Sequence, residues 1–328
     1  MKSALLFRLG GLGDLMVAFP SIFLLRRKLS PCLLTLVCRG EYGFILKETG
    51  VVDEIVSVGQ ARLSPLFDSS PYPGELGNWL KGFTLILGWM QKKSSLNHKE
   101  LSSSLGSERC RFFVLDPDYR GPISRYFFGK TLEYLTGMEG PIHSFNDCTR
   151  LPLSSIQEEA GLRLLGKELS KDRRKGAGKR PKIVVVHPGS GSKSKCWALE
   201  NFMEMIHQFS RQGYRGALVT GFADVELENK INSHTLPKNW VWLSNPSLVK
   251  LSGLLSASSL YLGNDSGITH LAAACRTKVL ALFQNDLESA WRPYGRVTVI
   301  KGESVSDISP HTVLEAITRI LNSRNLLA

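Results

Sequence analysis

The sequence predicts an α/β protein made of two Rossmann-like domains that face a central cleft. Short apolar runs alternate with helical patterns in both halves of the chain, which is typical of parallel sheets covered by helices. A turn rich in glycine or serine follows the first apolar run of each half, at residues 10–13 and 189–192. A basic stretch at 171–180 separates the halves, and 328 residues exceed one average domain.

The first half begins with an apolar run at 3–9 that predicts a strand, and an apolar helix follows from about Leu15 to Leu29. The segment 68–79 is rich in proline and glycine and predicts a loop. Three further strands are expected, at 33–38, 83–89 and 111–117.

The second half repeats this order, with a β-branched strand at 182–187, a polar loop and a helix from about Leu199. The C-terminal segment from Pro310 to Leu327 predicts an amphipathic helix. Further strands are expected at 216–221, 241–246, 258–264 and 278–283. The predicted domains are 1–170 and 181–328, joined by a linker at 171–180, with a C-terminal helix that could return to the first domain.

The composition predicts a cytoplasmic protein whose partners carry negative charge. Six scattered cysteines without a C-x-x-C pair argue against a zinc site and a disulfide framework. No apolar run reaches the ~18 residues of a membrane span. The net charge of +12 favours phosphate-bearing substrates and a weak peripheral contact with the anionic inner face of the inner membrane. Specific nucleic-acid binding is not expected, because no helix-turn-helix, RRM or zinc-finger pattern is present.

The turn after the first strand carries Gly10, Gly11, Gly13 and Asp14. We expect Gly11 and Gly13 to let the backbone turn tightly, so that the helix starts beside the cleft and Asp14 lies at the mouth of the cleft. A carboxylate beside a helix N-terminus is stabilised in its charged form and can accept a proton. The alternative is that Asp14 only caps the helix.

A dinucleotide site is not favoured at this turn. In the pattern G-x-G-x-x-G begun at Gly11, the third glycine position is Met16, and the chain has no P-loop motif. The second strand ends at Cys38 and Arg39 without an acid for a ribose, although Arg39 leaves an NADP site open. The D-x-D sequence at 116–118 is interpreted as a turn built on its proline rather than as a metal site, and no metal ligands are assigned.

The loop after the strand at 182–187 combines Ser190, Gly191, Lys193 and Lys195. Lysine ammonium groups beside hydroxyl and backbone donors suit a pyrophosphate. The alternative is a surface loop with incidental lysines.

Asp265, Ser266 and Gly267 stand where a strand gives way to a helix. Free backbone N–H groups and the positive end of the helix dipole favour a phosphate there. A plain N-cap formed by Asp265 or Ser266 is the alternative. His270 follows one turn later, either as part of the same site or as a core histidine.

Two acids, Asp224 and Glu226, follow the strand that ends at Gly221. A carboxylate at this place could hold a ribose or a base. The alternative is that both are ordinary acidic residues of a helix start.

Together these stretches resemble glycosyltransferase family 9, the ADP-heptose:lipopolysaccharide heptosyltransferases, which have the GT-B fold. The resemblance covers most of the chain and depends on the order and spacing of its motifs. Four stretches carry it: "RLGGLGDLMVAFP" at 8–20, "HPGSGSKSKCWALENF" at 187–202, "VTGFADVELE" at 219–228 and "LGNDSGITHLAAA" at 262–274.

The resemblance implies that Asp14 is the catalytic base and that Lys195 contacts the donor phosphates. Because the loop reads "SKSKC", Lys193 could replace Lys195 in that role. The D-S-G turn at 265–267 would bind the pyrophosphate and the sugar. Two residues could match the family's acid near the nucleoside, Asp224 and Glu226.

The implied activity is inverting transfer of heptose from ADP-L-glycero-D-manno-heptose to a hydroxyl of the lipopolysaccharide inner core. The first domain would take the acceptor and the second the nucleotide sugar. No cofactor is obligatory in such enzymes, and help from Mg²⁺ is left open. Residues 60–130 match no subgroup, which leaves the acceptor open. Two alternatives are a nucleotide-sugar epimerase of the same fold and a non-catalytic nucleotide-binding protein.

Overall fold

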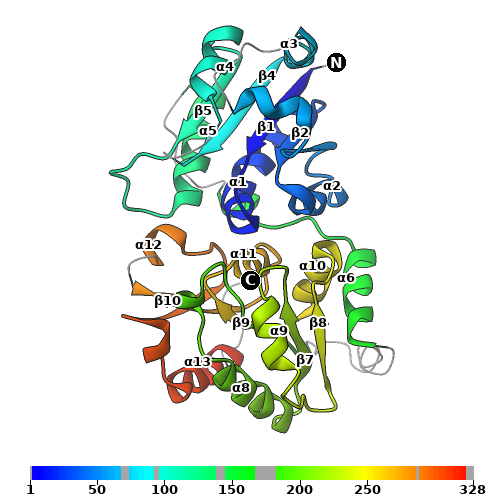
Figure 1. Cartoon of the computed structure of the whole chain (residues 1–328), viewed down its shortest axis with the longest axis vertical. Helices are drawn as coiled ribbons and strands as arrows, with labels where there is room; N and C mark the ends of the chain where they lie inside the picture. The colour runs from blue at the N-terminus through cyan, green and yellow to red at the C-terminus, as the bar shows by residue number, and fades with distance from the viewer. Residues whose placement is uncertain are drawn as a thin grey trace. The chain divides into compact units, whose positions relative to one another are not determined.

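The chain folds into two compact units, Met1–Pro152 and Leu153–Ala328 (Figure 1). The boundary lies earlier than the expected one at residue 170, and the basic linker expected at 171–180 lies outside the described residues. The computed structural model describes residues 2–67, 74–91, 96–137, 145–166, 182–285 and 288–322.

The boundary falls early because helix α6 (Ser155–Leu162) packs on helix α10 (Leu248–Ala257) of the second unit. Two glycines make this close packing feasible. A Cβ atom at Gly161 would overlap the backbone of α10, and one at Gly253 would overlap the backbone of α6. Any larger residue at either position would have to push the helices apart.

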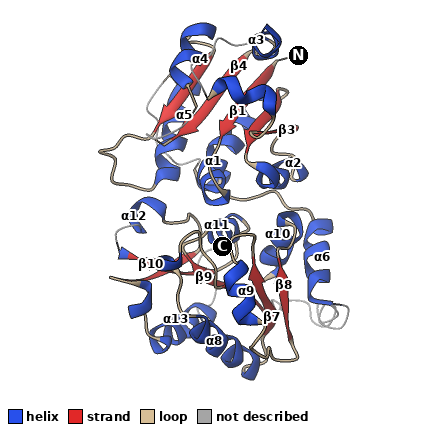
Figure 2. Ribbon diagram, in the orientation of Figure 1, coloured by secondary structure: helices blue, strands red, loops and turns tan. Residues whose placement is uncertain are grey.

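The first unit contains a five-stranded parallel sheet in the order β3-β2-β1-β4-β5, flanked by helices (Figure 2). Within the described residues, no helix has the length and apolarity of a membrane span. The strands are β1 (Ser3–Arg8), β2 (Leu33–Cys38), β3 (Glu54–Ser57), β4 (Leu85–Met90) and β5 (Cys110–Val114). The α-helices are α1 (Leu12–Leu29), α2 (Phe44–Glu48), α3 (Gly74–Lys81), α4 (His98–Leu105) and α5 (Ile123–Thr136).

Helix α3 occupies part of the segment that was expected to be a loop, so that prediction is wrong for residues 74–79. The helix forms because Leu76 and Leu80, four residues apart, bury one face in the core of the unit. Gly77 is tolerated on the open side of the helix, where no atom lies within 4 Å of the position that a Cβ atom would take.

The second unit contains a six-stranded parallel sheet in the order β11-β10-β9-β6-β7-β8. Its strands are β6 (Ile183–His187), β7 (Arg215–Thr220), β8 (Trp240–Ser244), β9 (Leu260–Asn264), β10 (Val279–Gln284) and β11 (Val297–Gly302). Besides α6 and α10, its α-helices are α8 (Leu199–Arg211), α9 (Val225–Ile231), α11 (Gly267–Ala274), α12 (Glu288–Trp291) and α13 (Pro310–Asn322).

Two features of this unit differ from the expectation. The edge strand β11 was not anticipated, because most of its side chains are only partly buried and its sequence lacks a clear alternation. The C-terminal helix was expected to be able to return to the first domain. Instead, α13 packs against α8, and its Val313 and Ile317 belong to the core of the second unit.

Both sheets have a point where successive connections leave the sheet in opposite directions. In the first unit this crossover lies between β1 and β4, and in the second it lies between β6 and β9. The loops that follow such a strand pair diverge and leave room for a ligand at the carboxyl ends of the strands. Most of the candidate site residues follow these strands, in both units, whereas Asp224 and Glu226 follow β7.

Candidate functional site

In the first unit, polar side chains gather around the carboxylate of Asp14. Asp14 is the third residue of α1, and its Oδ2 accepts the N–H of Gly11, the N-cap residue, over 3.0 Å. Its Oδ1 accepts from the guanidinium of Arg8 over 2.6 Å and from the side-chain amide of Gln91 over 3.1 Å. Both oxygens are held, yet the side chain remains 23% exposed.

The partner of this carboxylate is a buried cation. Arg8 ends β1 and is only 3% exposed. Its guanidinium also donates to the carbonyl oxygens of Trp89 (2.9 Å) and Asp14 (2.8 Å), and it lies over the ring of Phe127. Burial lowers the pKa of Arg8 from its ordinary value, and the charge of Asp14 opposes this shift. The sequence offered one signal for this role, an arginine inside an apolar strand.

The glycine that allows a close contact with Asp14 is not one of the two that were expected to shape this turn. A Cβ atom at Gly10 would overlap the side chain of Asp14, so the carboxylate can fold back only because this residue is glycine. Gly11 is extended (φ −72°), and its nearest contact would be 3.9 Å away, at Asp14 Oδ2. Gly13 lies within the first turn of α1. The close approach of the carboxylate therefore depends on Gly10 rather than on Gly11.

In the second unit, the loop after β6 meets the turn after β9. The ammonium of Lys195 lies 2.7 Å from Oδ2 of Asp265, and the hydroxyl of Ser190 donates to the Asp265 carbonyl oxygen over 2.6 Å. Here the carboxylate is the hidden partner: Asp265 is 10% exposed, whereas Lys195 is 29% exposed. The structure thus joins three of the predicted donor-site residues.

The other lysine of the loop lies apart from this group. Lys193 pairs with Glu226 over 2.5 Å, and both side chains are exposed. The hydrogen bond from Lys193 lowers the pKa of Glu226. Gly191 is exposed in the same loop, with open space around it. Of the two candidate lysines, only Lys195 reaches the turn after β9.

The predicted D-S-G turn opens helix α11. Ser266 is the N-cap residue, and its Oγ accepts the N–H of Thr269 over 3.3 Å. Gly267 is the first residue of the helix, where backbone N–H groups have no acceptor within the helix. His270 is buried, with 2% of its surface exposed. The turn therefore presents backbone donors, while His270 is enclosed in the unit.

Two polar residues that the sequence analysis did not single out, His187 and Asn264, form hydrogen bonds to the loops of this site. His187 ends β6, and its Nε2 lies 3.2 Å from Oδ2 of Asp224. Asn264 ends β9; its amide donates to the Pro188 carbonyl oxygen over 2.7 Å and its Oδ1 accepts the N–H of Trp197 over 3.1 Å. The available signal was a polar residue at the carboxyl end of an apolar strand. Asp224, expected near a nucleoside, is buried against His187.

The D-x-D sequence forms the turn that was expected after β5. The N–H of Asp118 donates to Oδ1 of Asp116 over 2.9 Å, so one of the two acids closes the turn. In the part of the chain that the structure describes, no three His, Cys, Asp or Glu side chains gather as a metal-binding group. The role of Mg²⁺ stays a prediction.

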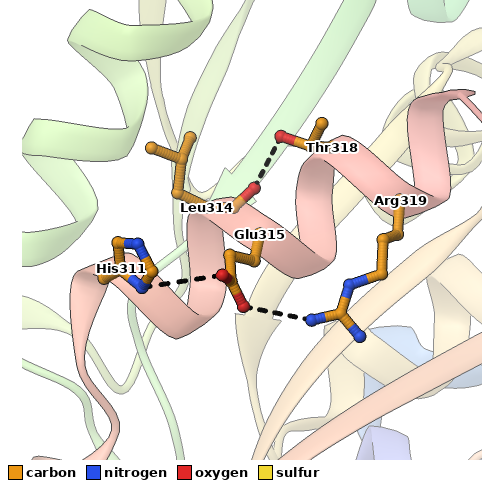
Figure 3. A pocket seen from close by; sticks show the side chains of 5 residues that line it. All are labelled: His311, Leu314, Glu315, Thr318 and Arg319. Atoms are coloured by element: carbon orange, nitrogen blue, oxygen red, sulfur yellow. Dashed lines mark hydrogen bonds and ion pairs between the residues drawn. The ribbon is translucent and has the colours of Figure 1, made fainter.

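A surface hollow of about 390 Å³ runs along α13 and does not involve these residues (Figure 3). Glu315 pairs there with Arg319 over 3.1 Å and with His311 over 3.9 Å, and the hydroxyl of Thr318 donates to the Leu314 carbonyl oxygen. All these contacts join residues four apart on the solvent-facing side of one helix. They are typical of a solvated helix surface.

The loop after β6, the turn after β9 and helix α11 all lie inside a stretch that matches a known family. The profile of glycosyltransferase family 9 (heptosyltransferase) matches residues 142–311, just over half of the chain. The chain belongs to glycosyltransferase family 9. The family expected from the four motifs is thereby confirmed.

Similar proteins support the same assignment. Lipopolysaccharide heptosyltransferase 3 of Escherichia coli K12 is 28% identical over 120 residues, which is 36% of this chain and 35% of that enzyme. The match thus spans about a third of this curated relative's length.

Solved structures show the fold over nearly the whole chain. A family 9 glycosyltransferase from Veillonella parvula DSM 2008 has a TM-score of 0.75 at 16% identity. The ADP-heptose lipopolysaccharide heptosyltransferase II of Escherichia coli has a TM-score of 0.70 at 19% identity, and each comparison covers 98% of both chains. The expected GT-B class, with two Rossmann-like domains, is confirmed.

Proposed function

We propose that this protein transfers a heptose from ADP-L-glycero-D-manno-heptose to a hydroxyl of the lipopolysaccharide inner core, with inversion at the sugar carbon. One observation carries the proposal: a partly exposed lysine, Lys195, is anchored by Asp265 beside the open N-terminus of α11. A fixed positive charge next to free backbone N–H groups suits the diphosphate of a nucleotide sugar. Family membership supports a heptose as the group transferred.

The second unit would hold the donor and stabilise the leaving group. The ammonium of Lys195 and the N–H groups of Gly267 and Ile268 would face the diphosphate. As the bond between the sugar carbon and the phosphate oxygen breaks, its electron pair stays with ADP and negative charge develops there. Donors that are already in place stabilise this charge without reorganisation.

The first unit would supply the base. Oδ1 of Asp14 receives two donors and Oδ2 receives one, so Oδ2 offers the more open lone pair. This oxygen would take the proton of the acceptor hydroxyl while the hydroxyl oxygen bonds to the sugar carbon on the face opposite to ADP. General-base catalysis of this kind contributes roughly 10²–10⁴-fold in rate.

The wider setting belongs to the proposal as well. The enzyme would work in the cytoplasm, with weak peripheral contact to the anionic face of the inner membrane where its acceptor lies. The net charge of +12 supports such a contact. No cofactor is required in the proposed reaction, and Mg²⁺ dependence is tested by adding a chelator to the assay.

The direct test is a donor and acceptor matrix. Purified protein is incubated with a panel of nucleotide sugars, with and without heptose-deficient core oligosaccharide, and release of nucleoside diphosphate is measured. We expect ADP release only when ADP-heptose and the oligosaccharide are both present. The anomeric configuration of the product, measured by NMR, should be opposite to that of the donor.

Other outcomes would identify the rival functions. Conversion of a nucleotide sugar to its epimer without acceptor would contradict the proposal in favour of an epimerase. Tight ADP binding without turnover on any acceptor would favour a nucleotide-binding protein. A product with the donor's configuration would contradict inversion.

A further inference from the structure

A buried polar relay runs through the second unit beneath the loop after β6. The ring of His187 lies between a carboxylate and a hydroxyl: its Nε2 is 3.2 Å from Oδ2 of Asp224, and its Nδ1 is 3.2 Å from Oγ of Ser266. The side chains of His187 and Asp224 are only 5% and 6% exposed. The relay connects the ends of three strands, β6, β7 and β9.

The carboxylate of Asp224 is buried, and its Oδ2 makes two contacts inside the protein. Its Oδ2 also accepts the N–H of Gly221 over 2.8 Å, which closes the turn after β7. A Cβ atom at Gly189 would overlap this carboxylate, so the loop after β6 can cover it only because that residue is glycine. Since Asp224 is enclosed in this way, it anchors His187 rather than reaching a ligand.

The relay engages the Ser266 hydroxyl inside the protein. A carboxylate only accepts hydrogen bonds, so Nε2 of His187 carries the hydrogen that Asp224 receives. In the neutral ring Nδ1 is then an acceptor, and the hydroxyl of Ser266 can donate to it over 3.2 Å or to Oγ1 of Thr269 over 3.1 Å. The hydrogen of Thr269 Oγ1 itself goes to the Asn264 carbonyl oxygen. Oγ of Ser266 accepts in turn from the N–H of Thr269. The single hydroxyl hydrogen is used inside the protein in either case, which leaves none to donate to a phosphate oxygen.

We propose that His187 is a positioning residue of the donor site and acts through Ser266. Held by Asp224, the ring orients Ser266, and Ser266 caps α11 so that the N–H groups of Gly267 and Ile268 face a nucleoside diphosphate. This inference rests on the proposed function. It assigns Ser266 and Asp224, two residues expected to contact the donor, to support of the turn instead.

A double-mutant cycle on ADP binding tests the path from His187 to Ser266. In His187→Gln the amide can replace Nε2 toward Asp224 but does not reach Ser266, and Ser266→Ala removes the hydroxyl. We expect each variant to weaken ADP binding about three- to ten-fold, the range of one hydrogen bond. Because both changes break the same path, the double variant should bind no more weakly than the weaker single variant. Effects that multiply would overturn the inference.

A second histidine variant separates positioning from stability. His187→Asn can keep a contact at the place of Nδ1 and loses the one to Asp224, so it leaves a buried carboxylate without its donor. Its melting temperature should therefore lie below that of His187→Gln, while its ADP affinity should be higher. If ADP affinity simply follows melting temperature across the two variants, His187 is only structural and the inference fails.

Two controls distinguish this inference from the proposed function. Ser304→Ala removes the capping hydroxyl of the 3₁₀ turn at Val305–Asp307 and should leave ADP affinity unchanged. Lys195→Ala should weaken ADP binding whether or not the relay matters. Wild-type protein that binds no ADP overturns the donor assignment and the inference together. Wild-type binding that depends on Lys195 but not on His187 overturns the inference alone.

Discussion

In the Arg8–Asp14 ion pair, beside β1 in the first unit, the cation is the buried partner. In the Lys195–Asp265 pair, beside β6 in the second unit, the anion is the more buried partner. Arg8 is enclosed among Trp89, Phe127 and the start of α1, and the carboxylate of Asp14 keeps contact with solvent. In the second unit Asp265 is nearly buried and the side chain of Lys195 is the more exposed partner. Both pairs lie where the strand order of a parallel sheet reverses.

This difference indicates how one local fold can serve two kinds of chemistry. A buried partner holds its counter-ion in place, since leaving it unpaired would be costly. The accessible partner is the one that a substrate can meet. An accessible carboxylate can accept a proton, and an accessible ammonium can bind a phosphate. The following substitutions test whether the two pairs divide the work in this way.

The largest effect is expected for Asp14→Asn. Loss of the proton-accepting group should reduce turnover by about 10²–10⁴-fold at saturating substrates. The melting temperature should also fall, because both Asp14 oxygens accept hydrogen bonds and an amide would turn its nitrogen toward one of the donors. Turnover is therefore measured well below the transition. Retention of more than about a tenth of wild-type turnover would mean that the base lies elsewhere.

Gly10→Ala should have the next largest effect. The added Cβ would displace the Asp14 side chain, and a misplacement of about 1 Å can cost on the order of 10²-fold in rate. Gly11→Ala is the matched control, because the nearest atom to its added carbon is 3.9 Å away. Steady-state turnover of the two variants is compared. Equal losses in both would argue against a special role of Gly10.

Lys195→Ala should weaken ADP binding by roughly ten-fold or more, since a charge-assisted contact contributes about 1.5–3 kcal/mol. Lys193→Ala should change it little, because Lys193 pairs with Glu226 at the surface. Calorimetric titration of both variants with ADP gives the comparison. The reverse order of affinities would assign the phosphate contact to Lys193.

The smallest effect concerns a third pair, Arg26 with Asp53, whose members are both partly exposed. Burial raises the pKa of Asp53, but hydrogen bonds from the Leu34 N–H and from Arg26 outweigh it, so the pKa is lowered overall. The ionised carboxylate therefore stabilises the fold at neutral pH, and this contribution is lost as the pH falls through the lowered pKa.

For this pair, Asp53→Asn should reduce the free energy of unfolding at pH 7 by about 1 kcal/mol or less, since solvent screens a partly exposed pair. The difference from wild type should disappear at acid pH. Urea unfolding at pH 7 and at acid pH provides the measurement. A difference that persists under acid conditions would show that the carboxylate's charge is not its cause.

Local patterns were enough to predict the order of most strands and helices. Apolar runs next to glycine or serine turns marked β1, β6 and β9, because buried parallel strands are apolar on both faces. The domain boundary could not be predicted in this way. It depends on the packing of α6 on α10, which joins glycines far apart in the sequence.

The candidate site was predictable in its motifs but not in its partners. Asp14, Asp265 and the two lysines of the loop after β6, Lys193 and Lys195, stood out because charged residues follow apolar strands there. Arg8 and His187 did not, because their roles depend on residues brought near by the sheets, such as Trp89 across β1 and β4. Periodicity also says nothing about which member of an ion pair is buried.

The most direct test of the separate roles compares ADP affinity in Asp14→Asn and Lys195→Ala by calorimetry, on the preparations used for turnover. We expect Asp14→Asn to bind ADP like wild type although its turnover is lost, whereas Lys195→Ala should bind ADP roughly ten-fold more weakly or worse. Equal weakening of ADP binding in both variants would contradict this division of roles, because the two ion pairs would then share one task.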